Sequence, residues 1–410
     1  MIIDTVVSHG DWFNAWGSFG TPSVYRILSQ CRDAGIRKVY WRTFLGARAH
    51  YHSIIEPVAY GAEGIERPGN EGRDRLAYDL RQWDPFRDAV KITHEYGMQI
   101  SAWSTFYEET HVQLVTTKFA EQHPEYWWVS REGKTRPTKV SFGYPEVCQY
   151  KLNLIQEQAA YGVDDVCLDF FRENHLFGER HHQIIPKQEV DKDGVCIYGY
   201  EPPIIAAYQR QYGIDPREIP NSDENWVRFR AGYLTSFMEE VREMLNRQGI
   251  TLSAKLRSMN RIQAPFPYWE PERVPTNSLL GSFVDWPTWV ERGLLDEVML
   301  VYEMLDLCDL DPMTVLREAR AAKEIIGDRA KLMMAIWCYN LNDRSVVDGK
   351  RALDIAVNAA LQGGADGVVL WESTPIHGWG SSIGGAGGSE FGLWGKVKEL
   401  AQRPSAVLFT

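Results

Sequence analysis

Side chains capable of acid–base or nucleophilic chemistry come at the ends of several short apolar segments in this 410-residue chain. Three of them are carboxylates: Asp169, Glu303 and Glu372. A carboxylate buried within an apolar run without a partner is strongly unfavourable, so we expect each at the end of its segment, facing water or substrate. For Asp169 the purely structural alternative is an ion pair with Arg172. For the two glutamates it is an ion pair with a neighbouring cation.

Aromatic and cationic residues occupy the same kind of position as the carboxylates. The residues that we expect to bind a substrate there are His9, Trp41, Arg42, Trp103, Arg172, Lys255, Arg257, Tyr302, Trp337 and Trp371. Flat aromatic rings cover the apolar faces of sugars, and charged groups hydrogen-bond to the hydroxyls. Two carboxylates facing each other across such an opening are what cleavage of a glycosidic bond requires. Packing is the alternative for any single Trp.

Composition and charge argue against several other classes of protein. The net charge of −11 lacks the basic footprint of a nucleic-acid binder or a polybasic membrane-surface protein. We expect no disulfides, because none of the six cysteines forms a CxxC pair. We also expect no metal site, because the histidines are scattered in loops. The sequence contains no cofactor motif. No signal peptide or membrane span is visible, which predicts a cytoplasmic protein, with a secreted form that has lost its leader as the alternative. The sequence leaves the oligomeric state open.

Short strands alternating with amphipathic helices are the elements that must position these residues. The predicted strands are 2–7, 37–42, 98–103, 164–170, 251–256, 296–302, 331–337 and 366–371. Eight units of this kind favour a closed (β/α)8 barrel with parallel strands over a doubly wound sheet.

Helices are predicted in the spaces between these strands. Their ranges are 22–34, 145–161, 224–247, 312–326 and 346–362. We expect one barrel domain over residues 1–410, with insertions at about 43–83, 172–201 and 257–284. Each insertion follows the carboxyl end of a strand, where barrels of this type build their active sites.

Three stretches carry a family resemblance: VYWRTFLGARAHYHS (39–53), HPEYWWVSREGK (123–134) and SFGYPEVCQYKLNLIQEQAAYGVDDVCLDFFRE (141–173). They resemble the glycoside hydrolases described as family-ten-like, which are similar in plan to the α-galactosidase superfamily of barrels. The strand-four motif of that group is matched here except that Asp165 replaces a Gly. The resemblance implies a barrel that cleaves glycosidic bonds, with Asp169 as nucleophile and the acid/base on strand six, where this chain has Glu303.

Retaining hydrolysis of a glycoside is therefore the leading hypothesis. The resemblance further implies that the two carboxyl groups lie about 5 Å apart, as in retaining enzymes generally. A lyase, isomerase or aldolase that uses Lys255 as base or Schiff-base amine is one alternative. A carbohydrate-binding barrel without catalysis is another. The concentration of cations at Arg42, Arg172, Lys255, Arg257 and Arg261 also allows an anionic sugar as substrate, unless these cations pair with the protein's own carboxylates.

Overall fold

A computed structural model provides the coordinates of the chain. It describes residues 1–8, 11–12, 20–45, 48–56, 80–111, 115–170, 189–260, 276–302, 307–338, 346–371 and 393–403.

Eight parallel strands form a closed barrel, which confirms the predicted fold class. They are β1 (Ile2–Val7), β2 (Lys38–Leu45), β4 (Gln99–Thr105), β9 (Asp165–Asp169), β10 (Thr251–Arg257), β11 (Glu297–Val301), β12 (Lys331–Trp337) and β13 (Gly367–Trp371). Closure is achieved at β1, which pairs in parallel with β13 on one side and with β2 on the other. A short strand, β3 (Arg48–Ala49), adds an antiparallel pairing to the end of β2.

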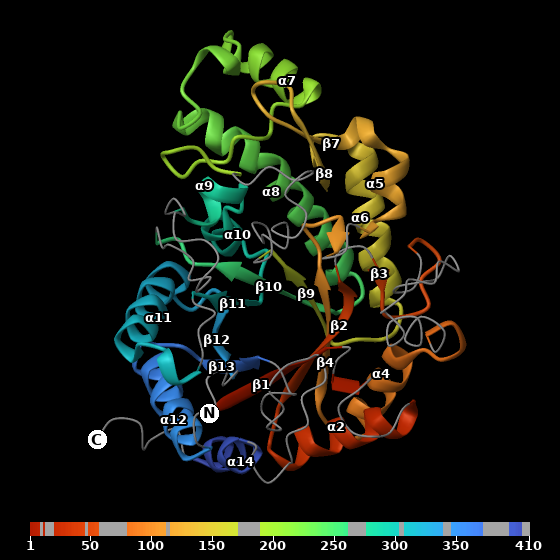
Figure 1. The fold of residues 1–410 in the computed structure, drawn as a ribbon, viewed down its shortest axis with the longest axis vertical. Helices are drawn as coiled ribbons and strands as arrows, with labels where there is room; N and C mark the ends of the chain where they lie inside the picture. The colour runs from red at the N-terminus through yellow and green to blue at the C-terminus, as the bar shows by residue number, and fades with distance from the viewer. Residues whose placement is uncertain are drawn as a thin grey trace, which may run out of the picture.

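Helices surround the barrel on the outside (Figure 1). In chain order they are α2 (Thr21–Asp33), α4 (Pro85–Glu95), α6 (Pro145–Ala159), α8 (Glu224–Asn246), α10 (Trp286–Glu291), α11 (Pro312–Ile326), α12 (Val346–Gln362) and α14 (Trp394–Gln402). Helices α4, α6 and α11 begin with proline, which is pre-organised for the first helical position. The side chain of Asp311 caps α11 by accepting hydrogen bonds from the backbone N–H groups of Met313 and Thr314. All five predicted helices are present within two residues of their expected ends.

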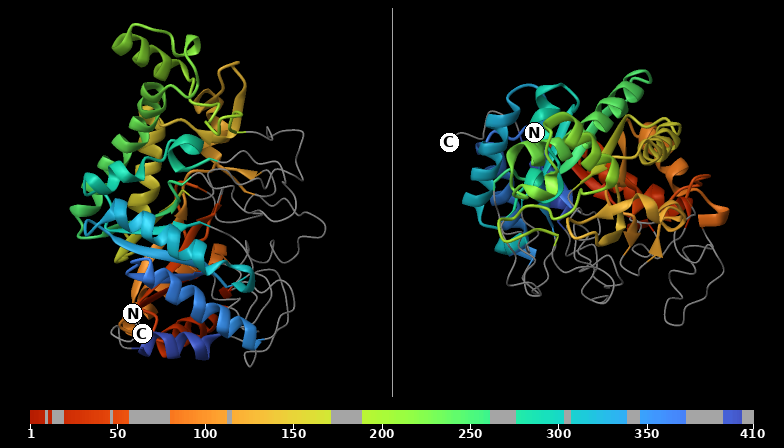
Figure 2. Two further views of the ribbon diagram at one scale, coloured as in Figure 1. Left: turned by 90° about the vertical axis from the view of Figure 1, so that its left-hand side faces the viewer. Right: turned by 90° about the horizontal axis from the view of Figure 1, so that it is seen from above.

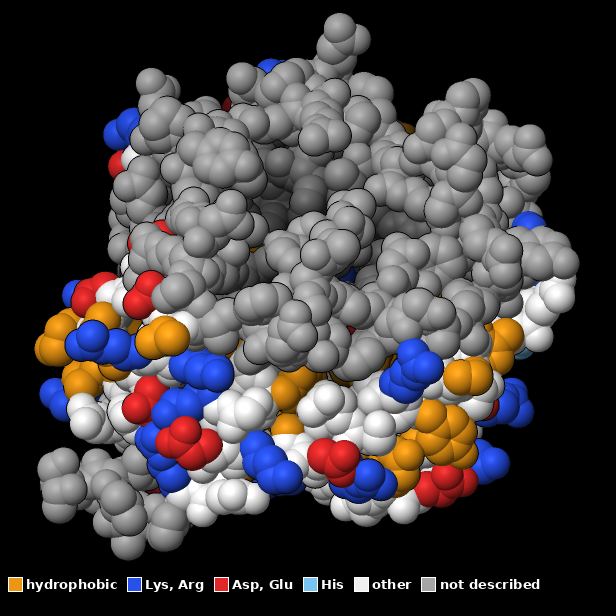
Figure 3. Space-filling model, turned by 60° about the horizontal axis from the view of Figure 1, so that its bottom comes forward, with side chains coloured by type: hydrophobic (Ala, Val, Ile, Leu, Met, Phe, Trp, Pro, Cys, Tyr) orange, Lys and Arg blue, Asp and Glu red, His pale blue; other side chains and the backbone are white. Residues whose placement is uncertain are grey.

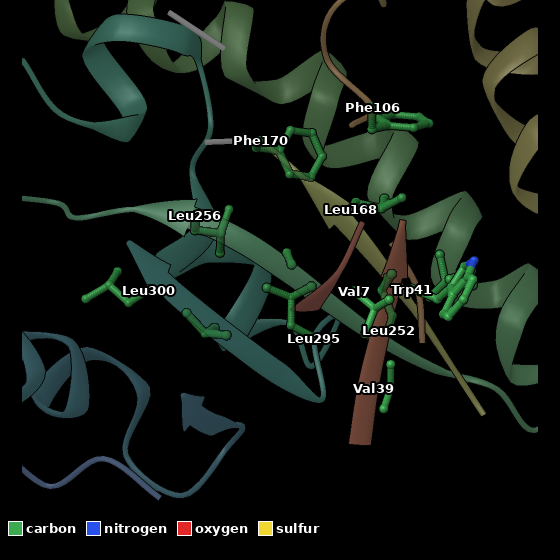
Figure 4. Close-up of a cluster of buried hydrophobic side chains, with 14 of the residues drawn as sticks. Val7, Val39, Trp41, Phe106, Leu168, Phe170, Leu252, Leu256, Leu295 and Leu300 are labelled. Carbon is green, nitrogen blue, oxygen red and sulfur yellow. The ribbon is translucent and has the colours of Figure 1, made fainter. Parts of the chain in front are cut away.

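Successive residues of the strands point alternately toward the barrel axis and toward the helices. On β9, Val166 and Leu168 belong to the cluster between the strands and the helices, which we call the outer core (Figure 4). Cys167 belongs instead to a smaller cluster that fills the barrel, which we call the inner core. The same alternation holds on β2, where Val39 lies in the outer core and Tyr40 in the inner core. This period of two decides which strand-end residues can share a site.

A lobe extends from one side of the barrel, at the top of Figure 1 and at the top of the left view of Figure 2. It comprises the described parts of residues 106–144 and 189–223. Its elements are β5 (Thr110–His111), β6 (Val115–Thr116), α5 (Lys118–Gln122), η1 (Pro124–Tyr126), β7 (Trp127–Val129), β8 (Thr135–Val140), α7 (Pro202–Tyr212) and η4 (Pro216–Glu218). Residues 106–144 form an insertion after the third barrel strand that was not predicted from the sequence. Two further short helices lie outside the lobe: α9 (Ser278–Ser282) and η5 (Leu307–Asp309).

Arg230 of α8 fastens the lobe to the barrel. Its buried guanidinium donates hydrogen bonds to the carbonyls of Cys196 (3.1 Å) and Tyr198 (2.8 Å). Gly199 makes this approach feasible, because a Cβ at that position would lie 2.7 Å from Cδ of Arg230. The backbone of Gly199 also has a φ of 93°, which side-chain-bearing residues rarely adopt.

Charged residues of both signs are interspersed on the surface over the helices at the bottom of Figure 1, as the coloured part of Figure 3 shows. On α12 and α14 they form pairs such as Lys396–Glu399 (3.0 Å) and Arg403–Asp354 (2.6 Å). Exposed pairs of this kind contribute at most about 1 kcal/mol each. None of the helices in the described part of the chain is both long and apolar enough to cross a membrane.

Candidate active site

The carboxyl ends of the barrel strands gather the residues on which the sequence analysis focused. Asp169 is the last residue of β9, and its Cα pairs with Thr105 of β4 and with Lys255 of β10. On the opposite side of the barrel, Trp371 of β13 pairs with Trp337 of β12. Because all eight strands run in the same direction, these ends form one rim, the usual location of a barrel active site.

Asp169 is completely buried at this rim and has two hydrogen-bond donors on the same oxygen. Its Oδ2 accepts from the indole Nε1 of Trp103 at 3.1 Å and from the ammonium group of Lys255 at 3.2 Å. The predicted structural alternative was an ion pair with Arg172, which lies outside the described residues; the ion pair that the structure contains is with Lys255. Hydrogen bonds to an ionised group are stronger than neutral ones, so this pair fixes the carboxyl group.

Aromatic rings and cations are stacked around this carboxyl group. The ammonium group of Lys255 lies 3.5 Å from the centre of the Trp371 ring, and the guanidinium of Arg42 lies 3.8 Å from that of Trp103. The two indoles meet nearly edge to face, with centroids 4.7 Å apart. Trp337, half-buried, stacks on Trp371 at 5.6 Å. Contacts of this kind are worth about 0.5–2 kcal/mol each.

Trp41 does not join these residues, and its expected role as a wall of the site was wrong. It lies in the outer core (Figure 4). Its ring stacks on that of Trp12 with centroids 6.2 Å apart. The reason is the alternation along β2: Arg42 faces the axis, so its neighbour Trp41 must face the helices. Tyr302, which follows β11, likewise packs in the outer core. Both were assigned to substrate binding without regard to which side of the strand they occupy.

Arg257 ends β10 two residues after Lys255 and is buried, in line with its predicted position at the rim. Its carbonyl accepts a hydrogen bond from the indole of Trp286 at 3.0 Å. Four predicted site residues lie outside the described residues: Glu303, Glu372, His9 and Arg172. Among the residues that are described, no group of three His, Cys, Asp or Glu side chains could hold a metal ion.

The amino end of the barrel contains a second group of buried charges. Lys38 lies 2.8 Å from Glu297 and 3.5 Å from Asp165, and the hydroxyl of Tyr40 also donates to Glu297. Burial raises the pKa of Asp4, in the same group, to about 6, against the attraction of nearby cations. Burial is the strongest single influence on Glu297 and acts to raise its pKa, but the charge and hydrogen bond of Lys38, the hydrogen bond of Tyr40 and the charge of Arg37 together outweigh it and lower that pKa. Asp165 thus belongs to the structural face, as predicted.

Two acidic residues that follow β4 were not singled out in the sequence. Glu109 is buried in an ion pair with Lys151 of α6, and it also accepts a hydrogen bond from Thr117 at 2.7 Å. Glu108 is buried close by and acts electrostatically on Lys139 of β8. The sequence FYEE (106–109), two residues after the predicted strand 98–103, was the available signal. These carboxylates join the lobe to the barrel next to the rim.

The chain, a closed (β/α)8 barrel with an aspartate fixed among tryptophans at its carboxyl rim, belongs to the class of glycoside hydrolase-like barrels. More narrowly, the chain belongs to the family described as Glycosyl hydrolase-like 10, whose sequence profile matches residues 27–351. This confirms the resemblance seen in the strand-four motif. A search of curated proteins found no significant match.

Solved structures of carbohydrate-active enzymes share the fold. The glycoside hydrolase domain of PgaB (BpsB) from Bordetella bronchiseptica is 14% identical with a TM-score of 0.56, over 92% of this chain and 94% of that one. The catalytic domain of a β-amylase from Paenibacillus polymyxa is 10% identical with a TM-score of 0.54, over 98% and 99% of the two chains. At such identities the similarity concerns the fold alone.

Proposed function

We propose that this protein hydrolyses glycosidic bonds with retention of configuration, with Asp169 as the nucleophile and Glu303 as the acid and base. The observation that carries the proposal is the fixed carboxyl group of Asp169 at the carboxyl rim, hydrogen-bonded by Lys255 and Trp103. A nucleophile has to be held in a defined orientation toward the atom that it attacks. Membership of a glycosyl hydrolase-like family supports the choice of reaction.

The reaction has two steps that use the same two residues. In the first, an oxygen of Asp169 attacks the anomeric carbon and forms an ester, while the bond to the leaving oxygen breaks and that oxygen takes a proton from Glu303. In the second, Glu303 removes a proton from water, and the water oxygen attacks the anomeric carbon. The ester bond breaks, which releases the sugar and restores both residues.

The alternation of the strands supports Glu303 over Glu372 as the partner of Asp169. On β11 the axis-facing series runs through Glu297, Met299 and Val301, so that its next member in the sequence is position 303. On β13 the axis-facing residues are Val369 and Trp371, and this series does not include position 372. By its spacing in the sequence, position 303 is thus in step with the axis-facing residues of its strand, and position 372 is out of step with those of its own.

Substrate binding is proposed at the aromatic side of the rim. Trp337 is the only half-buried member of the described tryptophan group at the rim, so it is the ring most accessible to a sugar. Lys255 is ion-paired with Asp169, so we assign it no role as an anion receptor or as a Schiff-base amine. Arg257 remains a candidate for binding an acidic substituent of the sugar.

A screen on neutral and acidic aryl glycosides and on polysaccharides tests the proposal. Proton NMR of the first-formed product reports whether configuration is retained, and a 2-fluoro glycoside should trap the ester on Asp169 for peptide mass spectrometry. Inverted product would refute Asp169 as nucleophile. Binding of sugars without turnover would favour a carbohydrate-binding barrel, and trapping of Lys255 by borohydride with substrate would favour the lyase or aldolase alternative.

A further inference from the structure

Arg42 is separated from Asp169 by an indole ring. Its guanidinium carbon lies 3.8 Å from the centre of the Trp103 ring and 5.8 Å from that of Trp371. The ring of Trp103 in turn donates its N–H to Oδ2 of Asp169 at 3.1 Å. Both Arg42 and Trp103 are almost completely buried. Arg42 therefore lies against the face of the Trp103 ring, and the N–H of the same ring donates the hydrogen bond to Asp169, the proposed nucleophile.

A cation over the face of an indole affects that ring in two ways. It restricts the ring to one plane, because attraction to the ring quadrupole is strongest directly above the face. It also draws electron density from the ring, which strengthens the N–H as a hydrogen-bond donor, as in other polarised networks. The edge-to-face contact of Trp103 with Trp371, at 4.7 Å, holds the same ring from another direction.

The orientation of Asp169 depends on this ring. Two donors among the described residues, Trp103 and Lys255, both bond to Oδ2 of this carboxyl group. Two donors on one oxygen define the rotation of the carboxyl plane about its bond to Cβ, and hence the direction in which the other oxygen points. Lys255 is itself fixed by its position 3.5 Å above the ring of Trp371.

We propose that Arg42 is a positioning residue that acts on Asp169 through Trp103. This assignment rests on the proposed function, because it concerns the orientation of the nucleophile. It replaces the expected role of Arg42 in direct binding of the substrate. The sequence could suggest a cation at the rim but not that an indole would lie between it and the carboxylate.

A double-mutant cycle measures the proposed coupling. Arg42→Met removes the cation, Trp103→Phe keeps a ring but removes the N–H, and the third protein carries both changes. Loss of a hydrogen bond to a charged group should lower kcat about tenfold in Trp103→Phe, with little change in KM. We expect Arg42→Met to lower kcat about fivefold in the parent and less than about twofold when Trp103 is already Phe, since its effect passes through the indole.

Two control variants isolate the effect from general damage. Trp127→Phe deletes another indole N–H, one that donates to the carbonyl of Ala120 in the lobe at 2.8 Å, and should leave kcat unchanged. Arg42→Lys keeps the charge but not the planar stack, and should recover part of the lost kcat. Independent, additive effects of Arg42→Met and Trp103→Phe would overturn the proposal. A rise in KM without a fall in kcat would do so as well, because it would indicate direct contact with the substrate.

A measurement on the resting protein separates this proposal from the proposed function. In protein labelled with ¹⁵N-tryptophan, the indole signal of Trp103 is identified by its loss in Trp103→Phe. We expect its proton to lie downfield, to move upfield in Asp169→Asn, and in Arg42→Met to move upfield and exchange faster with water. An unchanged proton shift and exchange rate in Arg42→Met would refute the relay, whether or not the protein turns over any glycoside. If the protein proved inactive while these shifts occurred, the proposed function would fail and the coupling would stand.

Discussion

Strand β9 carries one buried aspartate at each end of the barrel, and the two have different surroundings. Asp165, at the amino end, accepts hydrogen bonds from the hydroxyls of Ser101 and Ser253, both at 2.6 Å, and lies 3.5 Å from Lys38. Asp169, at the carboxyl end, is bonded by one ammonium group and one indole. Both face the barrel axis, and both have a lysine partner.

The two aspartates differ in the side chains that surround them apart from the lysine. Around Asp165 the neighbours are hydroxyls and other charged groups, which satisfy one another and hold the strands together. Around Asp169 the described neighbours include flat aromatic rings, one of which, Trp103, is itself a donor to the carboxyl group. The structural carboxylate is thus surrounded by small hydroxyl donors and other charges, whereas the proposed reactive one lies against the large rings of Trp103 and Trp371.

Replacing Asp169 is the strongest test of this contrast. Asp169→Asn keeps the volume of the side chain but removes the nucleophile, so we expect kcat to fall roughly 10⁴-fold or more. Folding and sugar binding should persist, as checked by circular dichroism and by titration with a non-hydrolysed sugar. Substantial turnover by this variant would place the chemistry on another carboxylate.

Replacing Glu303 should have the next largest effect on activity. Glu303→Gln removes the proposed proton donor, which typically contributes about 10²–10⁴-fold. The loss should be large for glycosides with poor leaving groups and small for activated aryl glycosides, because only the former need protonation. The matched comparison is Glu372→Gln: if that variant lost activity while Glu303→Gln kept it, the acid would belong to strand eight.

Replacing Asp165 should lower the stability of the protein rather than its activity. Asp165→Asn leaves Lys38 with one carboxylate fewer in a buried site, so we expect the free energy of unfolding to fall by about 3 kcal/mol. Urea denaturation measures this loss, and kcat of the folded enzyme should stay within about twofold of the parent value. A large fall in kcat without loss of stability would contradict a purely structural role for the amino end of the barrel.

Glu201 offers the smallest and most specific test, because its hydrogen bonds come from neutral groups in the lobe. It accepts from the N–H of Val129 at 2.7 Å and from the hydroxyl of Ser141 at 3.0 Å, and burial raises its pKa to about 7. A carboxyl pKa that is higher in the folded state favours folding at low pH, and this contribution is lost as the pH rises from about 4.5 to about 7.

Glu201→Gln should therefore become more stable relative to the parent as the pH rises. We expect the difference in free energy of unfolding to change by about 1–3 kcal/mol between pH 5 and pH 8 in favour of the Gln variant. Urea denaturation at four pH values in this range gives the curve. A difference that does not vary with pH would mean that Glu201 is charged across the whole range.

The elements of the fold were predictable because local signals agreed with the barrel. The apolar run 331–337 is both the predicted strand and β12, and Pro312, after the capping Asp311, is both the predicted start of a helix and the first residue of α11. Such signals involve residues close together in the chain. The lobe after β4 was missed because its two-stranded pairings are short, three to six residues each in β7 and β8.

The candidate site was less predictable because it depends on which side of a strand each residue occupies. Asp169 and Trp103 were correctly expected at strand ends, but their hydrogen bond depends on the register of two strands 60 residues apart, which includes the pairing of Trp103 with Cys167. Trp41 was misassigned because two adjacent strand residues cannot both face the axis. Counting along each strand in steps of two from Arg42, Trp103 or Asp169 would have separated the residues that face the axis from those that face the helices.

The inner core also keeps the two ends of the barrel apart. Asp165 and Asp169 are four residues apart on one strand, about 13 Å, and Cys167 lies between them in a layer of buried side chains with Tyr40 and Met299. Cys167, Tyr40 and Met299 are fully buried, so this part of the described layer is closed to water. We therefore expect protons used at the rim to arrive from the rim side, and we expect mutations among the buried charges at the amino end to change the acid sensitivity of the barrel's stability without changing that of turnover.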